Sequence, residues 1–183
     1  MIIGIAGTIG SGKGTVVEYL KQKGFGHYSS SDTLRAILRE QGKEDVRVNM
    51  SQLAHDLMQQ YPGGVLTMSY ERAKKDGARD FIMEAIHRET EAAYVRSMGG
   101  VILGVDADIK LRYERTQKRD DGDKDRVTFE EFVESSNRED EGKGTTSANI
   151  RAVIVSADAV IHNDGTLEEL HKQVDDVLAK FKK

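Results

Sequence analysis

The sequence predicts an α/β fold, a three-layer α/β/α sandwich around a mainly parallel, five-stranded sheet. Short apolar runs rich in β-branched residues alternate with segments whose apolar residues recur at helical spacing, as they do when helices connect parallel strands. The first apolar run is also followed directly by a glycine-rich loop and a helical pattern. We see no internal repeat and no convincing interior linker, so we expect a single domain over residues 1–183.

Four strands can be located from the apolar runs. Met1–Ala6 (MIIGIA) and Val101–Val105 (VILGV) have the composition of buried strands. Ala78–Glu84 and Ala159–Ile161 carry the same signal over shorter stretches. Gly26–Ser31, which is rich in glycine and serine, is interpreted as a turn.

Helices are expected in most of the remaining chain. The first follows the glycine-rich loop, places Val16, Val17 and Leu20 on one face and stops near Gly24. A capping box of Thr128 and Glu131, three residues apart, opens a later one. The other predicted helices are Thr33–Glu40, Val48–Tyr61, Leu66–Lys75, Thr90–Met98, Ile109–Arg119, Asn149–Ser156 and the amphipathic segment from Leu167 onward.

Composition excludes several functional classes. The 27 basic and 31 acidic residues give a net charge of −4, so no global basic field favours nucleic acid. The chain has no cysteine, which excludes disulfides, thiolate metal sites and thiol nucleophiles. No apolar run approaches the roughly 20 residues of a membrane span, and the N-terminal residues lack a signal-peptide pattern. We therefore expect a cytoplasmic protein without a membrane or nucleic-acid partner.

The glycine-rich loop matches the phosphate-loop pattern G-x-x-x-x-G-K. Small residues let backbone N–H groups close around a phosphate, and the positive end of the next helix points at the same oxygens. Lys13 adds a charge for the outer phosphates. A plain glycine turn is the alternative, but both flanks have the structure that a phosphate loop requires. We expect ATP to be bound by Gly7, Thr8, Ile9, Gly10, Ser11, Gly12, Lys13, Gly14 and Thr15.

The residue after Lys13 is Gly14, where most such loops have a magnesium-binding Ser or Thr. The ending G-K-G-T resembles the loop of nucleoside monophosphate kinases, adenylate kinases among them. That resemblance implies the fold of P-loop containing nucleoside triphosphate hydrolases and places magnesium near Thr15, Asp32 and Glu84.

Two further segments resemble the acceptor site of that family. The stretch from His27 to Ala36 is similar to H-x-S-T-G-D-x-L-R-A, which implies that Arg35 holds the acceptor phosphate and that Ser30 lies near the acceptor base. Phe81 to Arg88 is similar to F-L-L-D-G-F-P-R, which makes Arg88 a second phosphate-binding arginine and Glu84 the acidic residue that orders magnesium-bound water. Departures at Ser31, Ala85 and His87 weaken the match. Taken alone, Arg35 would be interpreted as a solvated helix residue, and it is the surrounding motif that favours the phosphate-binding role.

A fourth segment, Leu111 to Arg119, resembles the helix that leads into the mobile lid of these kinases. The resemblance directs Arg115 and Arg119 toward the donor phosphates, and it favours Arg138 over Arg126 as the lid arginine. It also implies a short lid at about 119–147 and an acceptor-binding insertion at about 32–75. The alternative for this helix is a solvated basic face.

The C-terminal segment Ala157–Leu170 resembles the closing strand and helix of dephospho-coenzyme A kinases and of small adenylate-kinase-related proteins of archaea. In that fold the loop after the last strand borders the donor base, which implies that Asn163 to Gly165 line it. A plain strand-to-helix turn explains the same residues equally well.

These features together predict a kinase that transfers a phosphoryl group from Mg-ATP to a nucleoside or deoxynucleoside monophosphate and gives the diphosphate. An acceptor that is already a phosphate needs no strong general base. One alternative is a dephospho-coenzyme A kinase, with Asp32 as the base for a ribose hydroxyl. Another is an adenylate-kinase-like ATPase that acts as an assembly or binding factor. The sequence leaves a monomer and a homodimer equally open.

Overall fold

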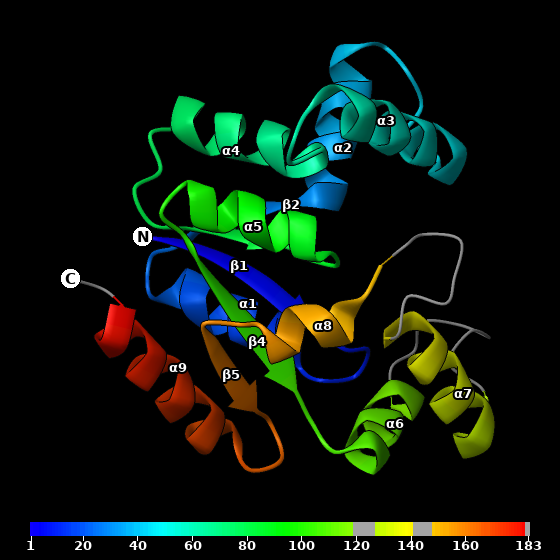
Figure 1. The fold of residues 1–183 in the computed structure, drawn as a ribbon, viewed down its shortest axis with the longest axis vertical. Coiled ribbons are helices and arrows are strands. Elements are labelled where there is room, and N and C mark those ends of the chain that lie inside the picture. The colour runs from blue at the N-terminus through cyan, green and yellow to red at the C-terminus, as the bar shows by residue number, and fades with distance from the viewer. Residues whose placement is uncertain (119–126, 141–147, 182–183) are drawn as a thin grey trace.

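The computed structural model describes residues 1–118, 127–140 and 148–181. Its five strands are β1 (Ile2–Gly7), β2 (Gly26–Ser29), β3 (Phe81–Glu84), β4 (Val101–Asp106) and β5 (Ala159–His162). They form one sheet in the order β2-β3-β1-β4-β5, and every pairing is parallel (Figure 1). The predicted α/β class is confirmed, and β1, which carries the glycine-rich loop at its end, is the central strand.

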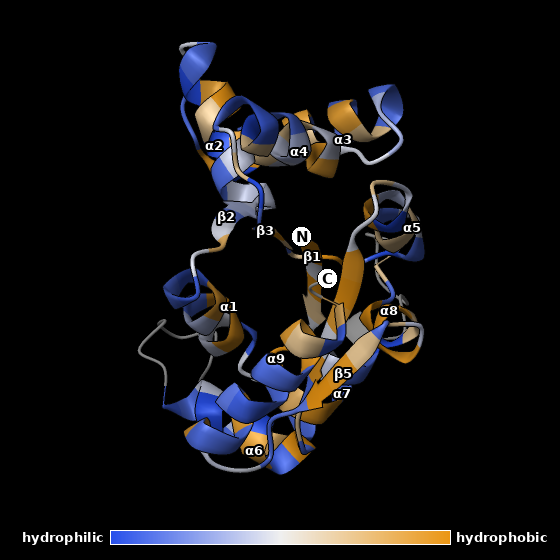
Figure 2. Ribbon diagram, turned by 90° about the vertical axis from the view of Figure 1, so that its left-hand side faces the viewer, coloured by the Kyte–Doolittle hydropathy of each residue, from blue (hydrophilic) through white to orange (hydrophobic). Residues whose placement is uncertain are grey.

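Helices cover both faces of the sheet. One face, called here the α1 face, packs against α1 (Lys13–Gln22) and α9 (Leu167–Phe181). The opposite face packs against α4 (Val65–Lys75), α5 (Glu89–Ser97) and α8 (Ile150–Val155). Side chains of each strand alternate between the two cores, so that Ile3 and Ile5 lie on the α1 face and Ala6 on the other. Figure 2 shows the hydrophobic residues concentrated around the sheet.

The remaining helices lie at opposite ends of the molecule (Figure 1). Beyond the β2 edge, α2 (Ser30–Glu40) and α3 (Arg47–Gln60) pack with α4, and these three helices cover the predicted acceptor insertion at 32–75. At the other end, α6 (Ile109–Gln117) packs against α7 (Phe129–Asp140), with the Tyr113 ring between Phe129 and Phe132. Helix α7 belongs to the predicted lid at 119–147, whose other residues lie mostly outside the described ranges.

Most predicted elements are confirmed to within a few residues. The capping box that opens α7 is present, with Glu131 N–H donating to Thr128 Oγ1 at 3.2 Å and Thr128 N–H to Glu131 Oε2 at 2.7 Å. The interpretation of Gly26–Ser31 as a turn was wrong, because Gly26–Ser29 forms β2 and α2 begins at Ser30. This strand has no apolar run of its own, and its stabilisation comes from pairing with β3. Among the described residues, no helix is long and apolar enough to cross a membrane.

Candidate nucleotide-binding site

The glycine-rich loop joins the central strand β1 to α1 at the carboxyl edge of the sheet, where parallel α/β folds bind their ligands. Gly10 and Gly12 have φ values of 77° and 89°, in the left-handed region that favours glycine. A side chain would not fit at either position, since a Cβ on Gly10 would lie 2.5 Å from the Arg112 carbonyl oxygen and one on Gly12 would collide with the Asn163 amide. The loop therefore requires both glycines, and Gly12 is the second glycine of the phosphate-loop pattern.

Neighbouring elements hold the loop in place through buried side chains. Arg112 of α6, only 5% exposed, donates from Nε to the Ile9 carbonyl at 2.9 Å. Asn163, just after β5, donates from Nδ2 to the Ser11 carbonyl at 2.9 Å, and Thr8 Oγ1 donates to Asp106 Oδ1 at 3.1 Å at the end of β4. None of these three contacts uses a backbone N–H group of the loop, which is the kind of donor that binds phosphate.

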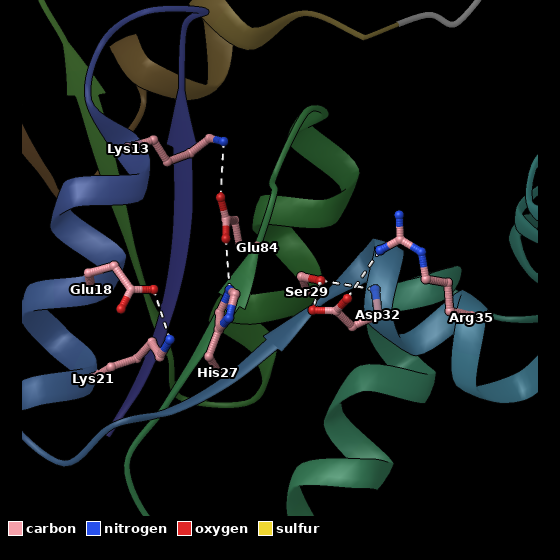
Figure 3. Close-up of polar contacts among 8 residues, drawn as sticks. All are labelled: Lys13, Glu18, Lys21, His27, Ser29, Asp32, Arg35 and Glu84. Atoms are coloured by element: carbon pink, nitrogen blue, oxygen red, sulfur yellow. Dashed lines mark hydrogen bonds and ion pairs between the residues drawn. The ribbon is translucent and has the colours of Figure 1, made fainter. Parts of the chain in front are cut away.

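Lys13 and Glu84 meet at the mouth of this loop (Figure 3). Lys13 Nζ lies 3.0 Å from Glu84 Oε1, and His27 Nε2 lies 2.7 Å from the other oxygen, Oε2. The hydrogen bond from His27 and the nearby charge of Lys13 lower the pKa of Glu84 from 4.5 to about 2, although burial opposes the shift. Glu84 is therefore ionised at neutral pH and only accepts hydrogen bonds, so His27 Nε2 must carry the proton.

The predicted acceptor residues on α2 lie beside this group. Ser29 caps α2, accepting from the Asp32 N–H at 3.0 Å and donating from Oγ to Asp32 Oδ2 at 2.7 Å (Figure 3). Arg35 Nη1 is 3.2 Å from Asp32 Oδ1, and both side chains are exposed. Ser30, half-buried, is the first residue of α2. Exposed ion pairs contribute little, about 0–1 kcal/mol, so Arg35 can exchange Asp32 for a phosphate at small cost.

Arg88 follows β3, the strand next to β2, and is the N-cap of α5. Its Nη1 lies 2.8 Å from Glu91 Oε1, and its backbone N–H donates to Glu91 Oε2 at 3.2 Å. The peptide before it is tied to α8, because Asn149 N–H donates to the His87 carbonyl at 2.9 Å. Arg35 and Arg88 thus lie at the carboxyl ends of two adjacent strands.

Of the three arginines predicted on the donor side, Arg115 and Arg138 differ in their surroundings. Arg115 of α6 donates from Nη2 to the Asn163 carbonyl at 2.8 Å, while its buried Nη1 has no hydrogen-bond partner among the described residues. That orphaned donor, beside the loop, fits a nucleotide ligand. Arg138 pairs with Glu134 on its own helix at 2.8 Å and is exposed. Arg119 lies outside the described residues.

Magnesium fits this site only as a partner of bound phosphates. No group of three or more His, Asp or Glu side chains placed to hold a metal is present in the described ranges. Thr15, exposed in the first turn of α1, and the ionised Glu84 offer a hydroxyl and a carboxylate oxygen at the loop, and Asp32 offers a further exposed carboxylate. Magnesium bound to substrate phosphates commonly takes only one or two protein oxygen ligands and keeps several waters.

Sequence reasoning missed two residues and one cavity of this region. Arg112 gave no signal, because a buried arginine and a solvated one look alike in a helical pattern, and His27 entered only as part of a motif. A cavity of about 550 Å³ borders the loop at Thr8 and is walled by α6, α7 and α8, with Arg112, Val133 and Arg151 among its lining residues. Its walls come from segments that only the tertiary structure brings together.

A five-stranded parallel sheet with a glycine-rich phosphate loop after its central strand defines a P-loop domain. A family model described as an AAA domain matches residues 3–144. A UPF0200 protein of Sulfurisphaera tokodaii is 31% identical over 182 residues, which are 98% of this chain and 97% of that protein. The chain therefore belongs to the UPF0200 family of P-loop proteins.

Solved structures of kinases share the fold. A shikimate kinase from Bacteroides thetaiotaomicron superposes with a TM-score of 0.59 at 9% identity, over 100% of this chain and 99% of that one. A dephospho-CoA kinase from Campylobacter jejuni superposes with a TM-score of 0.56 at 16% identity, over 98% and 96% of the two chains. At these identities the likeness establishes the P-loop kinase fold.

Proposed function

We propose that this protein is a kinase that transfers a phosphoryl group from Mg-ATP to the phosphate of a nucleoside or deoxynucleoside monophosphate. One arrangement carries the proposal. The phosphate loop and Lys13 follow β1, while Arg35 and Arg88 follow β2 and β3, so the arginines lie beside the donor site at the same edge of the sheet. Two guanidinium groups next to a phosphate loop match a donor and an acceptor that both carry phosphate.

The residues divide the work of phosphoryl transfer, which is mainly positioning and charge neutralisation. Residues Gly7 to Thr15 bind the donor phosphates, and Lys13 exchanges Glu84 for the charge of the transferred group. Arg35 and Arg88 release Asp32 and Glu91 to bind the acceptor phosphate. Arg115, whose Nη1 has no hydrogen-bond partner among the described residues, is proposed to close over the transition state together with Arg119 and the lid arginine Arg138.

Magnesium, when bound, supplies charge neutralisation on the donor oxygens. Thr15, Glu84 and Asp32 are the residues that would hold it, directly or through water. Glu84 is suited to this role because it stays ionised at neutral pH, its pKa being lowered to about 2 by His27 and Lys13.

The test is a product assay with Mg-ATP and a panel of all ribo- and deoxyribonucleoside monophosphates. We expect one acceptor or a small group of acceptors to be converted, and Lys13→Ala to lose at least about 100-fold in kcat. Lys21→Ala is the matched control, because Lys21 lies on the same helix but pairs with Glu18 at the surface. Arg35→Ala and Arg88→Ala should raise KM for the acceptor more than KM for ATP.

A second candidate, dephospho-coenzyme A kinase, is favoured by the position and the contacts of Asp32. Its exposed carboxylate is oriented by Ser29 and Arg35, as expected of a base that accepts a proton from a hydroxyl acceptor. The panel therefore includes dephospho-coenzyme A, whose conversion in place of a monophosphate would select this candidate. Lys13-dependent ATP hydrolysis with no acceptor phosphorylated would contradict both kinases and favour an ATPase that works on a macromolecular partner.

A further inference from the structure

Strand β2 directs two polar side chains toward the site from an otherwise apolar face. Its register with β3 pairs His27 with Ile82 and Ser29 with Glu84. Because strand side chains alternate, Phe25, His27 and Ser29 share the α1 face, where Phe25 and Ile82 belong to the hydrophobic core. Tyr28 points to the opposite face and packs edge-on against Phe81, with ring centroids 5.8 Å apart. His27 is thus the side chain at the boundary between that core and Glu84.

The His27 imidazole is half-buried at this boundary, where an apolar side chain could pack against the core instead. Its side chain is 22% exposed, and burying a polar ring costs free energy unless the ring is hydrogen-bonded. The bond goes to Glu84 Oε2 at 2.7 Å, which leaves Oε1 turned toward the phosphate loop and Lys13 (Figure 3). Of these two partners of Glu84, Lys13 is the one that the proposed function assigns to the phosphates of a bound nucleotide.

We infer that His27 is a positioning residue that holds the Glu84 carboxylate toward the donor site when Lys13 turns to the phosphates of Mg-ATP. The inference rests on the proposed role of Glu84 beside magnesium. Outer partners that orient a metal-linked carboxylate typically contribute 10- to 100-fold to affinity. Loss of His27 should therefore weaken binding of the magnesium–nucleotide complex and spare binding of the nucleotide alone.

The experiment measures binding of the fluorescent nucleotide mant-ATP to the full chain, once with excess magnesium and once with EDTA. His27→Leu removes the donor, and His27→Gln keeps a side-chain N–H. We expect His27→Leu to weaken binding about tenfold with magnesium and less than about twofold with EDTA, and His27→Gln to recover most of the loss. His171→Leu is the matched control, since His171 stacks on Tyr19 between α9 and α1. Circular dichroism checks that each variant is folded.

A double-mutant cycle with Glu84→Gln identifies the route of the effect. If His27 acts through Glu84, adding His27→Leu to Glu84→Gln causes no further loss of affinity. Equal losses with magnesium and with EDTA, no loss in either condition, or independent additive losses in the double variant would each overturn the inference.

The same experiment separates this inference from the proposed function. Magnesium-dependent binding that requires His27, together with no phosphorylated acceptor in the product assay, would defeat the kinase and keep the positioning role. Wild-type binding that is indifferent to magnesium would defeat the role of Glu84 and that of His27 with it, even where an acceptor is phosphorylated.

Discussion

At the scale of single residues, the site depends on side chains whose environment changes their chemistry. Glu84 is the clearest case, because burial by itself would raise the pKa of its carboxylate above the usual value. The hydrogen bond from His27 and the charge of Lys13 outweigh burial and lower its pKa to about 2. The ionised form is therefore stabilised in the folded protein.

That shift predicts a pH-dependent stability. A folded-state pKa lowered from 4.5 to about 2 stabilises the fold above pH 4.5, and the contribution is lost as the pH falls toward 2. Glu84→Gln should lower the free energy of unfolding by about 3 kcal/mol at neutral pH. Urea unfolding over a pH series should show the difference from wild type shrinking as Glu84 is protonated.

Glu18→Gln is the control for this series, since Glu18 forms a surface pair with Lys21 and is 63% exposed. Its difference from wild type should be small at every pH. A Glu84→Gln difference that stays constant from neutral to acidic pH would show that the ionised Glu84 is not what stabilises the fold.

Two neighbouring glycines give a second prediction at this scale. Gly12→Ala places a Cβ against the Asn163 amide at a φ of 89°, which should cost about 1–3 kcal/mol of stability and weaken nucleotide binding. Gly14→Ala adds a Cβ that meets nothing within 4 Å inside α1, so the free energy of unfolding should stay equal or rise. Denaturant unfolding of both variants is the measurement, and equal losses would contradict the steric argument.

At the scale of elements, Arg112 connects three segments. From α6 it reaches the Ile9 carbonyl of the phosphate loop and the Ser136 hydroxyl of α7, and its guanidinium lies over the Phe132 ring. Helix α7, part of the predicted lid, is therefore linked to the phosphate loop through one buried side chain.

Arg112→Met should accordingly destabilise the fold by about 2–3 kcal/mol, because it leaves the Ile9 carbonyl and the Ser136 hydroxyl without this partner. Affinity for Mg-ATP should fall as well, since the loop loses its anchor. Lys110→Met, an exposed change on the same helix, should stay within about 0.5 kcal/mol of wild type. Thermal unfolding and nucleotide titration measure both effects, and similar behaviour of the two variants would refute the anchoring role.

At the scale of the whole molecule, a ligand that binds only the folded chain must stabilise it. Mg-ATP at about 100 times its Kd should add about 2.7 kcal/mol, which is roughly 5–10 °C in Tm for a domain of this size. Lys13→Ala should abolish most of the shift, and Lys21→Ala should retain it. Differential scanning fluorimetry makes the comparison, and an equal shift in Lys13→Ala would exclude Lys13 from the site.

Much of the fold was predictable from the sequence because its signals are local. The alternation of apolar runs and helical patterns gave the α/β class, and the capping box at Thr128 located the start of α7. Strand β2 was not predictable in this way, because Gly26–Ser29 has no apolar run and is a strand only by pairing with β3. The phosphate loop could be predicted because its glycines and Lys13 all lie within residues 7–13 of the chain.

By itself, then, the sequence determined the fold class, the phosphate loop and the residues that we propose for the acceptor. Only the tertiary structure decided which side chains hold the phosphate loop and Glu84 in position. The bonds from His27 to Glu84, from Arg112 to Ile9 and from Asn163 to Ser11 join residues 57, 103 and 152 positions apart. Local patterns carry no information about such pairs, because strand order and helix packing determine which distant side chains meet at the carboxyl edge of the sheet.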